Sequence, residues 1–259
     1  MTDAAPRPFV LLEATYRQLL DYKPNVAVLP WGATEAHNFH LPHGTDVVEA
    51  QEVAVRAAEL AHARGGKPIV LPPVPFGNDE QQLDQVATIS IGTATAMAIL
   101  RDVVRSLKRQ GIDRLIIVNA HGGNELKPLI RDLQGEMKVL IVLANFWQMR
   151  PYADDPKCAI AGDHANEMET SVMLHLRPQW VDLKSAGPGE RVPFAVEGLA
   201  QAGVWTPRPW NQSHPDTGSG DPSRATAEKG RAFFQACSEA AAELIVGVSK
   251  AQKGQLPYV

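Results

Sequence analysis

The chain has 259 residues and a formal charge of −4, with 25 Lys and Arg against 29 Asp and Glu. Hydrophobic residues make up 44% and charged residues 21%, so a core of ordinary size can form without disulfides or a structural metal. The sequence contains no basic tract or basic amphipathic helix, which argues against nucleic acid and membrane surfaces as partners.

Apolar runs of strand length alternate with segments of helical periodicity along most of the chain. The expected elements, in chain order, are a strand over 25–31, a helix over 47–64, a strand over 69–74, a helix over 93–110, a strand over 114–119, a helix after residue 124, a strand over 138–144, a helix over about 165–176 and a helix over about 225–252. This alternation predicts a mostly parallel sheet with helices on both faces, in a single α/β domain over 1–259.

Two other features bear on organisation and location. Residues 181–224 are rich in Pro, Gly, Ser and Asn, and we expect a long connection there that shapes a site or an oligomer contact. The two cysteines, Cys158 and Cys237, are far apart and form no Cys-x-x-Cys pair, which favours a reduced setting. No apolar run approaches the roughly 20 residues that cross a bilayer, so we expect a cytoplasmic protein.

Five potential metal ligands follow the first strand within one short loop, WGATEAHNFHLPHGTD. They are Glu35, His37, His40, His43 and Asp46. The loop lies at the carboxyl end of the sheet, where open α/β folds bind ligands. Carboxylates and imidazoles without thiolates suit zinc, manganese or iron(II) rather than a structural zinc. Asp46 or Thr45 could instead cap the next helix, and each histidine alone could be a core or capping residue. The cluster as a whole favours metal binding, with His40 and His43 as the weaker candidates.

Two further polar clusters follow. NAHGGN, residues 119–124, comes directly after the third strand, so His121 is a candidate ligand from another direction. Alone, this sequence could be a tight turn or an anion-binding nest, and it lacks the Gly-Lys-Ser/Thr ending of a phosphate loop. DHANEMETS, residues 163–171, enters a helix and would place His164 and Glu167 on the same side of its first turn. Acids there also interact well with the helix dipole, which by itself could explain Glu167 and Glu169.

The three clusters, in this order, resemble the motifs of the creatininase family. The family patterns Gly-x-Thr-Glu-x-His, His-Leu-Pro and Asp are similar to GATEAH, HLP and HGTD here. Asn-Gly-His-Gly-Gly-Asn resembles NAHGGN, His-Ala-Gly-Glu-x-Glu-Thr-Ser resembles HANEMETS, and a Gly-Asp-Pro segment resembles residues 220–230. The resemblance runs from about residue 25 to 235, in the His-Gly-Gly-Asn branch. It implies a single three-layer α/β/α domain and a homo-oligomer, commonly a hexamer.

The resemblance also implies a site with two divalent transition-metal ions, zinc, manganese or iron, that share one aspartate. By position Asp46 is the bridge, Glu35 and His121 hold one ion, and His37 holds the other. The creatininase proper has a further glutamate ligand where Gly123 stands here. We expect Glu167 to take that role.

Two ions roughly 3.5–4 Å apart can hold a hydroxide at neutral pH and polarise a carbonyl oxygen. The resemblance therefore implies hydrolysis of a small-molecule amide, with His164 as the general acid that protonates the leaving nitrogen. Ala161 and Gly162 stand where the creatininase proper has a tryptophan lid, and residues 84–90 and 38–39 also depart from its pattern. These departures fall where the substrate should lie and argue against creatinine.

We expect a hydrolase of non-peptide C–N bonds in a small amide, cyclic amide or formamide. Similar proteins with His-Gly-Gly-Asn include a deformylase of a formamidopyrimidine nucleotide and a peptidase that trims a peptide-derived redox cofactor. Trp147, Trp205 and Trp210 are candidates for the pocket wall, although tryptophans more often pack in cores. Two alternatives remain: a non-catalytic metal-binding or small-molecule-binding protein of the same fold, and a two-metal phosphoester hydrolase. The joint presence of four ligands disfavours the first, and the lack of a phosphate loop disfavours the second.

Overall fold

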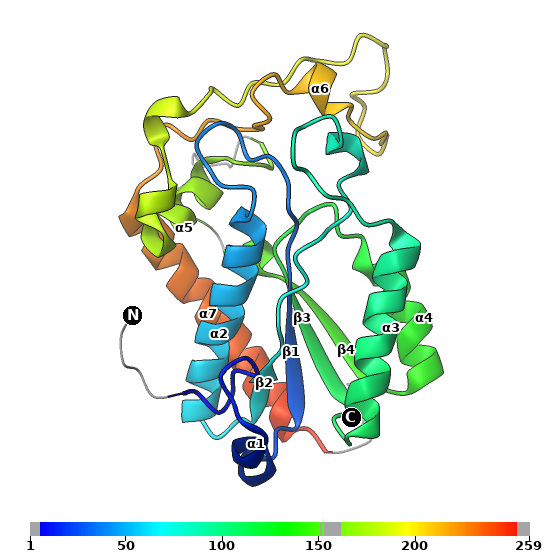
Figure 1. Ribbon diagram of the computed structural model, residues 1–259. Helices are drawn as coiled ribbons and strands as arrows, with labels where there is room; N and C mark the ends of the chain where they lie inside the picture. Colours follow the sequence, from blue (N-terminus) through cyan, green and yellow to red (C-terminus); the bar gives the residue numbers. More distant parts are fainter. Residues whose placement is uncertain (1–5, 151, 153–161, 253–259) are drawn as a thin grey trace.

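The computed structural model describes residues 6–150, 152 and 162–252. Strands and helices alternate along most of the chain, as expected (Figure 1). Their bounds are α1 Tyr16–Tyr22, β1 Val26–Trp31, α2 Thr45–Ala63, β2 Pro68–Val70, α3 Thr93–Arg109, β3 Arg114–Asn119, α4 Leu126–Met137, β4 Leu140–Asn145, α5 Glu167–Leu176, α6 Trp210–Ser213 and α7 Ala227–Lys250.

The four strands form one parallel sheet in the order β2-β1-β3-β4. Strands β1 and β3 pair from Ala27 with Leu115 to Trp31 with Asn119, so their carboxyl ends lie side by side. This confirms the expected parallel sheet. It also brings the loop after β1 next to the loop after β3, although about 90 residues separate them in sequence.

Helices cover both faces of the sheet. Helices α2, α5 and α7 lie on one face, and α3 and α4 lie on the other (Figure 1). Successive side chains of a strand point to opposite faces. Accordingly Val26 and Val28 of β1 join the core under α2 and α7, whereas Ala27 and Leu29 join the core under α3 and α4. The expected three-layer α/β/α architecture is confirmed.

Two element boundaries differ from the expectations for local reasons. Strand β2 ends at Val70, because two prolines follow at positions 72 and 73 and cannot donate to a sheet ladder. Strand β4 begins at Leu140 rather than at residue 138. Lys138 instead has a left-handed backbone, φ 52°, and caps α4.

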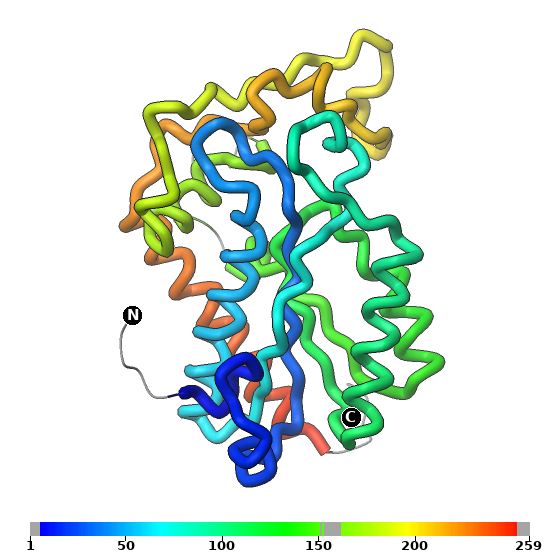
Figure 2. The backbone as a smooth tube through the Cα atoms, in the orientation of Figure 1, coloured from blue at the N-terminus to red at the C-terminus, as the bar shows by residue number. Residues whose placement is uncertain are grey.

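Residues 181–224 form the expected long connection and contain only short helical turns. This connection crosses the carboxyl end of the sheet, as the tube in Figure 2 shows in yellow and orange. It is tied to the loop after β1 by Asn38, whose side-chain amide donates to the Gly187 carbonyl at 3.1 Å and accepts from the Gly187 amide at 2.9 Å. Among the described residues, no helix is long and apolar enough to cross a membrane.

Candidate metal centre

The candidate ligands lie where connections to the sheet change direction. From β1 the chain runs through α2 to the outer strand β2, then crosses back through α3 to β3 on the other side of β1. Helices α2 and α4, which follow β1 and β3, cover opposite faces, so the loops after these two strands diverge and leave a crevice between them. Glu35 and His37 follow β1, and His121 follows β3.

Asp46 lies in the first turn of α2. This turn packs closely against Gly32, directly after β1, because glycine has no side chain. A side chain at Gly32 would lie 2.6–2.8 Å from backbone atoms of Asp46 and Val47, so glycine is required there. The N-cap of α2 is Gly44, without a side-chain cap hydrogen bond. Neither Asp46 nor Thr45 is therefore the cap, and the Asp46 carboxylate, 1% exposed, faces the crevice.

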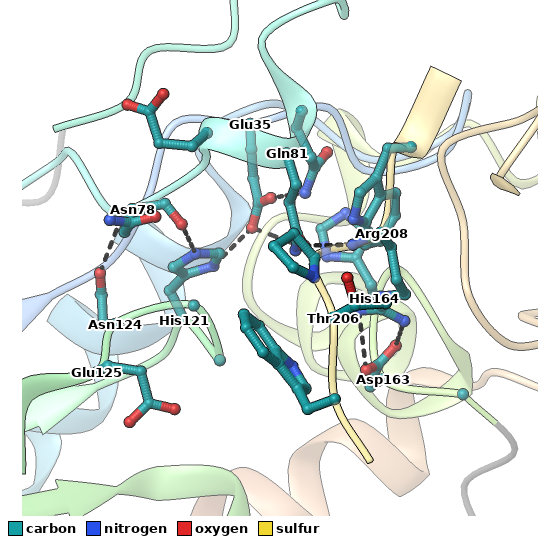
Figure 3. Close-up of a pocket in the computed structure, with 18 of the residues that line it drawn as sticks. Glu35, Asn78, Gln81, His121, Asn124, Glu125, Asp163, His164, Thr206 and Arg208 are labelled. Atoms are coloured by element: carbon teal, nitrogen blue, oxygen red, sulfur yellow. Dashed lines mark hydrogen bonds and ion pairs between the residues drawn. The ribbon is translucent and has the colours of Figure 1, made fainter. Parts of the chain in front are cut away.

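The two carboxylate oxygens of Asp46 face different histidines. Oδ1 lies 2.9 Å from Nε2 of His37, and Oδ2 lies 3.1 Å from Nδ1 of His121. Glu35 Oε1 lies 2.7 Å from the same Nδ1 (Figure 3). Within the described part of the chain, Glu35 Oε1 and Asp46 Oδ2 nevertheless accept no hydrogen bond. Asp46 Oδ1 forms a hydrogen bond with Nε2 of His37, whereas Glu35 Oε1 and Asp46 Oδ2 lie around a common point with Nδ1 of His121, as the ligands of an ion do.

Three groups of side chains place potential ligand atoms within 4.8 Å of one another, and all members are buried. The groups are Glu35 with His37 and His164, Glu35 with Asp46 and His121, and His37 with Asp46 and Glu169. Because the groups share members, they form one contiguous cluster of six side chains. The set combines carboxylate oxygens with imidazole nitrogens, a donor set that fits zinc, manganese or iron(II).

The structure places Glu167, the expected fifth ligand, outside the cluster, because α5 turns this side chain away from it. Its carboxylate lies 2.7 Å from Nζ of Lys229 on α7. Glu169 points inward instead, is 8% exposed, and accepts a hydrogen bond from the Ala165 amide. The side chain of Asn166 caps α5 by accepting from the Met168 and Glu169 amides. This cap starts the helix at Glu167.

His164 therefore lies before α5 and shares no helical turn with Glu167, contrary to the sequence expectation. Its backbone instead pairs with Ser219 of the long connection. The imidazole Nε2 lies 2.7 Å from the Ala36 carbonyl, and Nδ1 lies 3.8 Å from Glu35 Oε1. Burial, together with His37 beside it, lowers the pKa of His164 well below its usual value. The neutral ring donates Nε2–H to Ala36 and turns the Nδ1 lone pair toward the cluster.

Several residues that the sequence analysis missed hold the candidate ligands in place. Asp79 Oδ1 lies 2.9 Å from Nε2 of His121, and Gln82 donates a hydrogen bond to Oε2 of Glu35. Gly123 leaves room for the His121 ring, because a Cβ at this position would lie 2.4 Å from its Nε2. Such outer contacts fix the orientation of ligands in metal sites. No local pattern marks Asp79 or Gln82, since both lie in an irregular segment after β2.

The two weaker histidine candidates lie outside the cluster. His40 Nε2 lies 2.8 Å from Oγ1 of Thr170, and burial lowers the pKa of His40 to about 4. His43 Nε2 lies 2.9 Å from the carbonyl of Val86. Both side chains connect neighbouring segments of the fold, and neither belongs to the three ligand groups.

The cluster has an excess of buried carboxylates. Burial raises the pKa of Glu35 to about 7 and that of Glu169 to about 8. Both carboxylate oxygens of Glu49, one turn after Asp46 on α2, accept no hydrogen bond within the described structure. Five buried acids meet three buried histidines here: Glu35, Asp46, Glu49, Asp79 and Glu169 against His37, His121 and His164. Unpaired buried charge is costly, and two divalent cations would neutralise it.

A cavity of about 1120 Å³ opens from this cluster toward the long connection. Figure 3 shows His121, Asn124 and Glu125 on one side of the cavity and His164, Asp163 and Arg208 on the other. The three tryptophans considered from the sequence, at positions 147, 205 and 210, all line it.

The comparisons with known proteins agree with this geometry. The model of the creatininase family, described as creatinine amidohydrolase, matches residues 12–245. The chain belongs to the creatininase family. Creatininases are hydrolases.

A mycofactocin precursor peptide peptidase from Mycobacterium ulcerans is 32% identical over 85% of this chain and 84% of its own length. The creatinine amidohydrolase of Pseudomonas putida is 28% identical over 85% of this chain and 88% of its own. A solved structure from Bacteroides fragilis, provisionally named a creatinine amidohydrolase, is 39% identical with a TM-score of 0.87, covering 95% of this chain and 98% of that one.

A creatininase variant complexed with creatine is 22% identical, with a TM-score of 0.76 over 95% of this chain and all of that one. At this identity the likeness shows the creatininase fold alone. Other structures of that fold are described as a Zn-Zn type and as a Mn form.

Proposed function

We propose that the chain is a metal-dependent amidohydrolase whose two divalent ions share Asp46. The observation that carries this proposal is the division of the Asp46 oxygens between His37 on one side and His121 with Glu35 on the other. Glu169 completes the His37 side in place of Glu167. Bound there, the ions would supply an activated water and polarise the substrate carbonyl.

The protein's own contribution begins with the orientation of these ligands. The Asp79 carboxylate contacts Nε2 of His121, which leaves Nδ1 of that ring for the cluster. The backbone carbonyl of Glu35, 3.1 Å from Nδ1 of His37, likewise turns Nε2 of that ring toward the cluster, where it contacts Asp46 Oδ1. These contacts select which ring nitrogen of each histidine would face an ion once the ring has lost its proton.

His164 is placed to move the proton that amide hydrolysis requires. Water adds its hydroxyl to the carbonyl carbon, the C–N bond breaks, and the remaining proton goes to the departing nitrogen. The neutral His164 ring turns its Nδ1 lone pair toward the cluster, so it accepts that proton and then delivers it. This order of proton transfers extends the role expected for His164, which acts first as a base and then as an acid.

The substrate class follows from the cavity and from the relatives. Ligand pockets commonly measure about 300–1,000 Å³, so the cavity of about 1120 Å³ has room for more than a small cyclic amide. The relatives at similar identity are named as a peptidase and as a creatinine amidohydrolase. We therefore include short peptides with small amides and formamides among the substrates.

A product-based screen of the metal-loaded protein tests this function. Small amides, formamides and short peptides are assayed for released amine, ammonia or formate, and phosphoesters are assayed for phosphate. The proposal expects amide products that disappear in Asp46→Asn. Phosphate release without amide cleavage would favour the phosphoesterase, and no turnover in any class would favour a binding protein.

A further inference from the structure

The arginine side chains of the cavity are confined to its roof, which the long connection forms. Among the described residues that line it, Arg191 and Arg208 are the only lysine or arginine side chains, and both belong to the long connection. Acidic side chains line the cavity in the metal cluster and at positions 80, 125 and 163. Outside the metal cluster, a ligand in this cavity therefore meets a lysine or arginine side chain only on the long connection.

Arg208 is already committed to another residue. Its Nη1 and Nη2 lie 3.0 and 3.1 Å from the two carboxylate oxygens of Asp163, and its guanidinium lies 4.9 Å from the ring centre of Trp210. The Arg208 amide also donates to Oε1 of Gln81 at 3.1 Å. Asp163 directly precedes His164 in the chain, so Arg208 secures the roof beside His164 (Figure 3). Its charge is balanced there.

Arg191 has no such partner. Within the described part of the chain no carboxylate pairs with its guanidinium, which lies 4.7 Å from the ring centre of Phe194. The backbone around Arg191 is nevertheless fixed, because the Gly189 amide donates to Oδ2 of Asp216 at 2.8 Å and the Val192 amide donates to the Ser213 carbonyl at 2.8 Å. The structure thus presents an exposed cation without a carboxylate partner from a backbone segment that is held in place.

Arg191 also lies on the His164 side of the cavity. Together with Arg208 and Asp163 it lines a smaller hollow of about 500 Å³ that shares these three residues with the main cavity. A group bound by Arg191 would therefore lie on the side from which His164 delivers a proton to the leaving nitrogen. The planar guanidinium fork suits a carboxylate, which it can bind with two hydrogen bonds.

We propose that Arg191 binds a carboxylate carried by the leaving amine of the substrate. The substrate class is then an amide whose nitrogen belongs to an amino acid, as in an N-acyl amino acid or at the carboxyl end of a short peptide. Hydrolysis adds the water hydroxyl to the acyl carbon and the proton to the nitrogen, and it releases a free amino acid or short peptide. This inference rests on the proposed amidohydrolase function and adds the direction in which the substrate lies.

A matched pair of metal-binding probes tests the carboxylate directly. N-formyl-N-hydroxyalanine has a chelating group with a carboxylate on its nitrogen side, and its carboxamide differs only in that charge. In titrations of the metal-loaded protein, the free acid is expected to bind about 10- to 100-fold more tightly than the carboxamide. Arg191→Ala should abolish the preference, and Arg191→Lys should retain part of it. Arg109→Ala, an exposed arginine outside the cavity, is the control that should retain all of it.

Equal affinity for the two probes, or a preference that survives in Arg191→Ala, overturns the inference while leaving the amidohydrolase function intact. A chain that binds no metal overturns the proposed function, and the inference fails with it. A turnover assay then distinguishes an N-acyl amino acid from a short peptide as the substrate. Release of alanine is measured with N-acetylalanine in one reaction and with a dipeptide that ends in alanine in the other. Whichever of these two compounds is hydrolysed, the same compound with its carboxylate converted to an amide should be hydrolysed more slowly.

Discussion

Glu167 and Glu169 lie two residues apart at the start of α5 and face opposite sides of that helix. Successive helical residues are rotated by about 100°, so positions i and i+2 point in nearly opposite directions. Glu167 lies 2.7 Å from Lys229, and Glu169 shares a ligand group with His37 and Asp46. The start of α5 at Glu167 decides which acid reaches the cluster.

This pair provides a matched test of the ligand set. Glu169→Gln should lose about one ion per chain and most of the activity, because it removes a charged ligand from the His37 side. Glu167→Gln should keep both ions and lose only a partly exposed ion pair, which contributes about 1 kcal/mol or less to stability. Metal content by mass spectrometry measures both variants. Loss of metal in the Glu167 variant alone would restore the ligand assignment expected from the sequence.

The two glycines of His-Gly-Gly-Asn should differ in their tolerance of a methyl group. A Cβ at Gly123 would lie 2.4 Å from Nε2 of His121 and 2.6 Å from the Asn78 carbonyl, whereas a Cβ at Gly122 meets nothing within 4 Å. We predict that Gly123→Ala displaces the His121 ring and weakens metal binding at least 10-fold, as loss of supporting contacts does in other metal sites. Gly122→Ala should bind metal as the parent does. Competition with a chromogenic chelator measures both affinities, and equal affinities would contradict the packing.

His164 should matter for turnover more than for metal. Replacement of a general acid–base group typically lowers the rate about 10²- to 10⁴-fold. We predict a loss of this size in kcat for His164→Asn on whichever amide the screen identifies, with both ions retained. A variant that turns over at the parent rate would exclude this role. Loss of one ion instead would make His164 a ligand, as its group with Glu35 and His37 also permits.

The metal-free protein should lose stability as the pH rises from about 7.5 to 9.5. Burial raises the pKa of Glu169 to about 8, and that of Glu35 to about 7. Burial opposes protonation of His37, but Asp46 and Glu35 still raise its pKa to about 10. A group whose pKa is higher in the folded than in the unfolded chain stabilises the folded state. This stabilisation is complete at pH values below the unfolded pKa, and it is lost as the pH rises through the folded pKa.

In this window His164 and Asp46, whose folded pKa values are lowered, contribute no pH dependence, because they lose their stabilising effect only in acid. The slope should approach about 1.4 kcal/mol per pH unit for each proton that only the folded chain retains. Chemical unfolding of the chelator-treated protein at a series of pH values measures this slope. Metal-loaded protein should show a flatter profile, since the ions replace the protons, and Glu169→Gln should flatten the metal-free profile. A metal-free parent whose stability is constant across this range would contradict the buried charge balance.

Local patterns predicted much of this architecture and that four of the candidate ligands would lie close together. The β-branched run at 114–119 and the apolar spacing of α3 depend on neighbours in sequence, and both elements lie where expected. Glu35, His37, Asp46 and His121 follow strand ends, which a parallel sheet brings together. The motifs of the creatininase family supplied the rest of the expected ligand set.

The remaining features depend on contacts between distant segments, and no local pattern encodes them. Asp79 and Gln82 belong to an irregular segment whose path over β1 is set by tertiary packing. The choice of Glu169 over Glu167 depends on one hydrogen-bonded cap, at Asn166, which shifts the helix start by about two residues from its expected position. Helix boundaries are the least predictable feature of a sequence, and here such a shift exchanges one acid for another.

The most direct test of the shared-aspartate site is the metal content of the purified chain beside that of Asp46→Ala. We predict about two transition-metal ions per parent chain, with both bound more weakly in the variant, because Asp46 contacts the His37 side and the His121 side. One ion or none in the parent would contradict this prediction. So would a variant that binds both ions as tightly as the parent, since the Asp46 carboxylate would then hold neither.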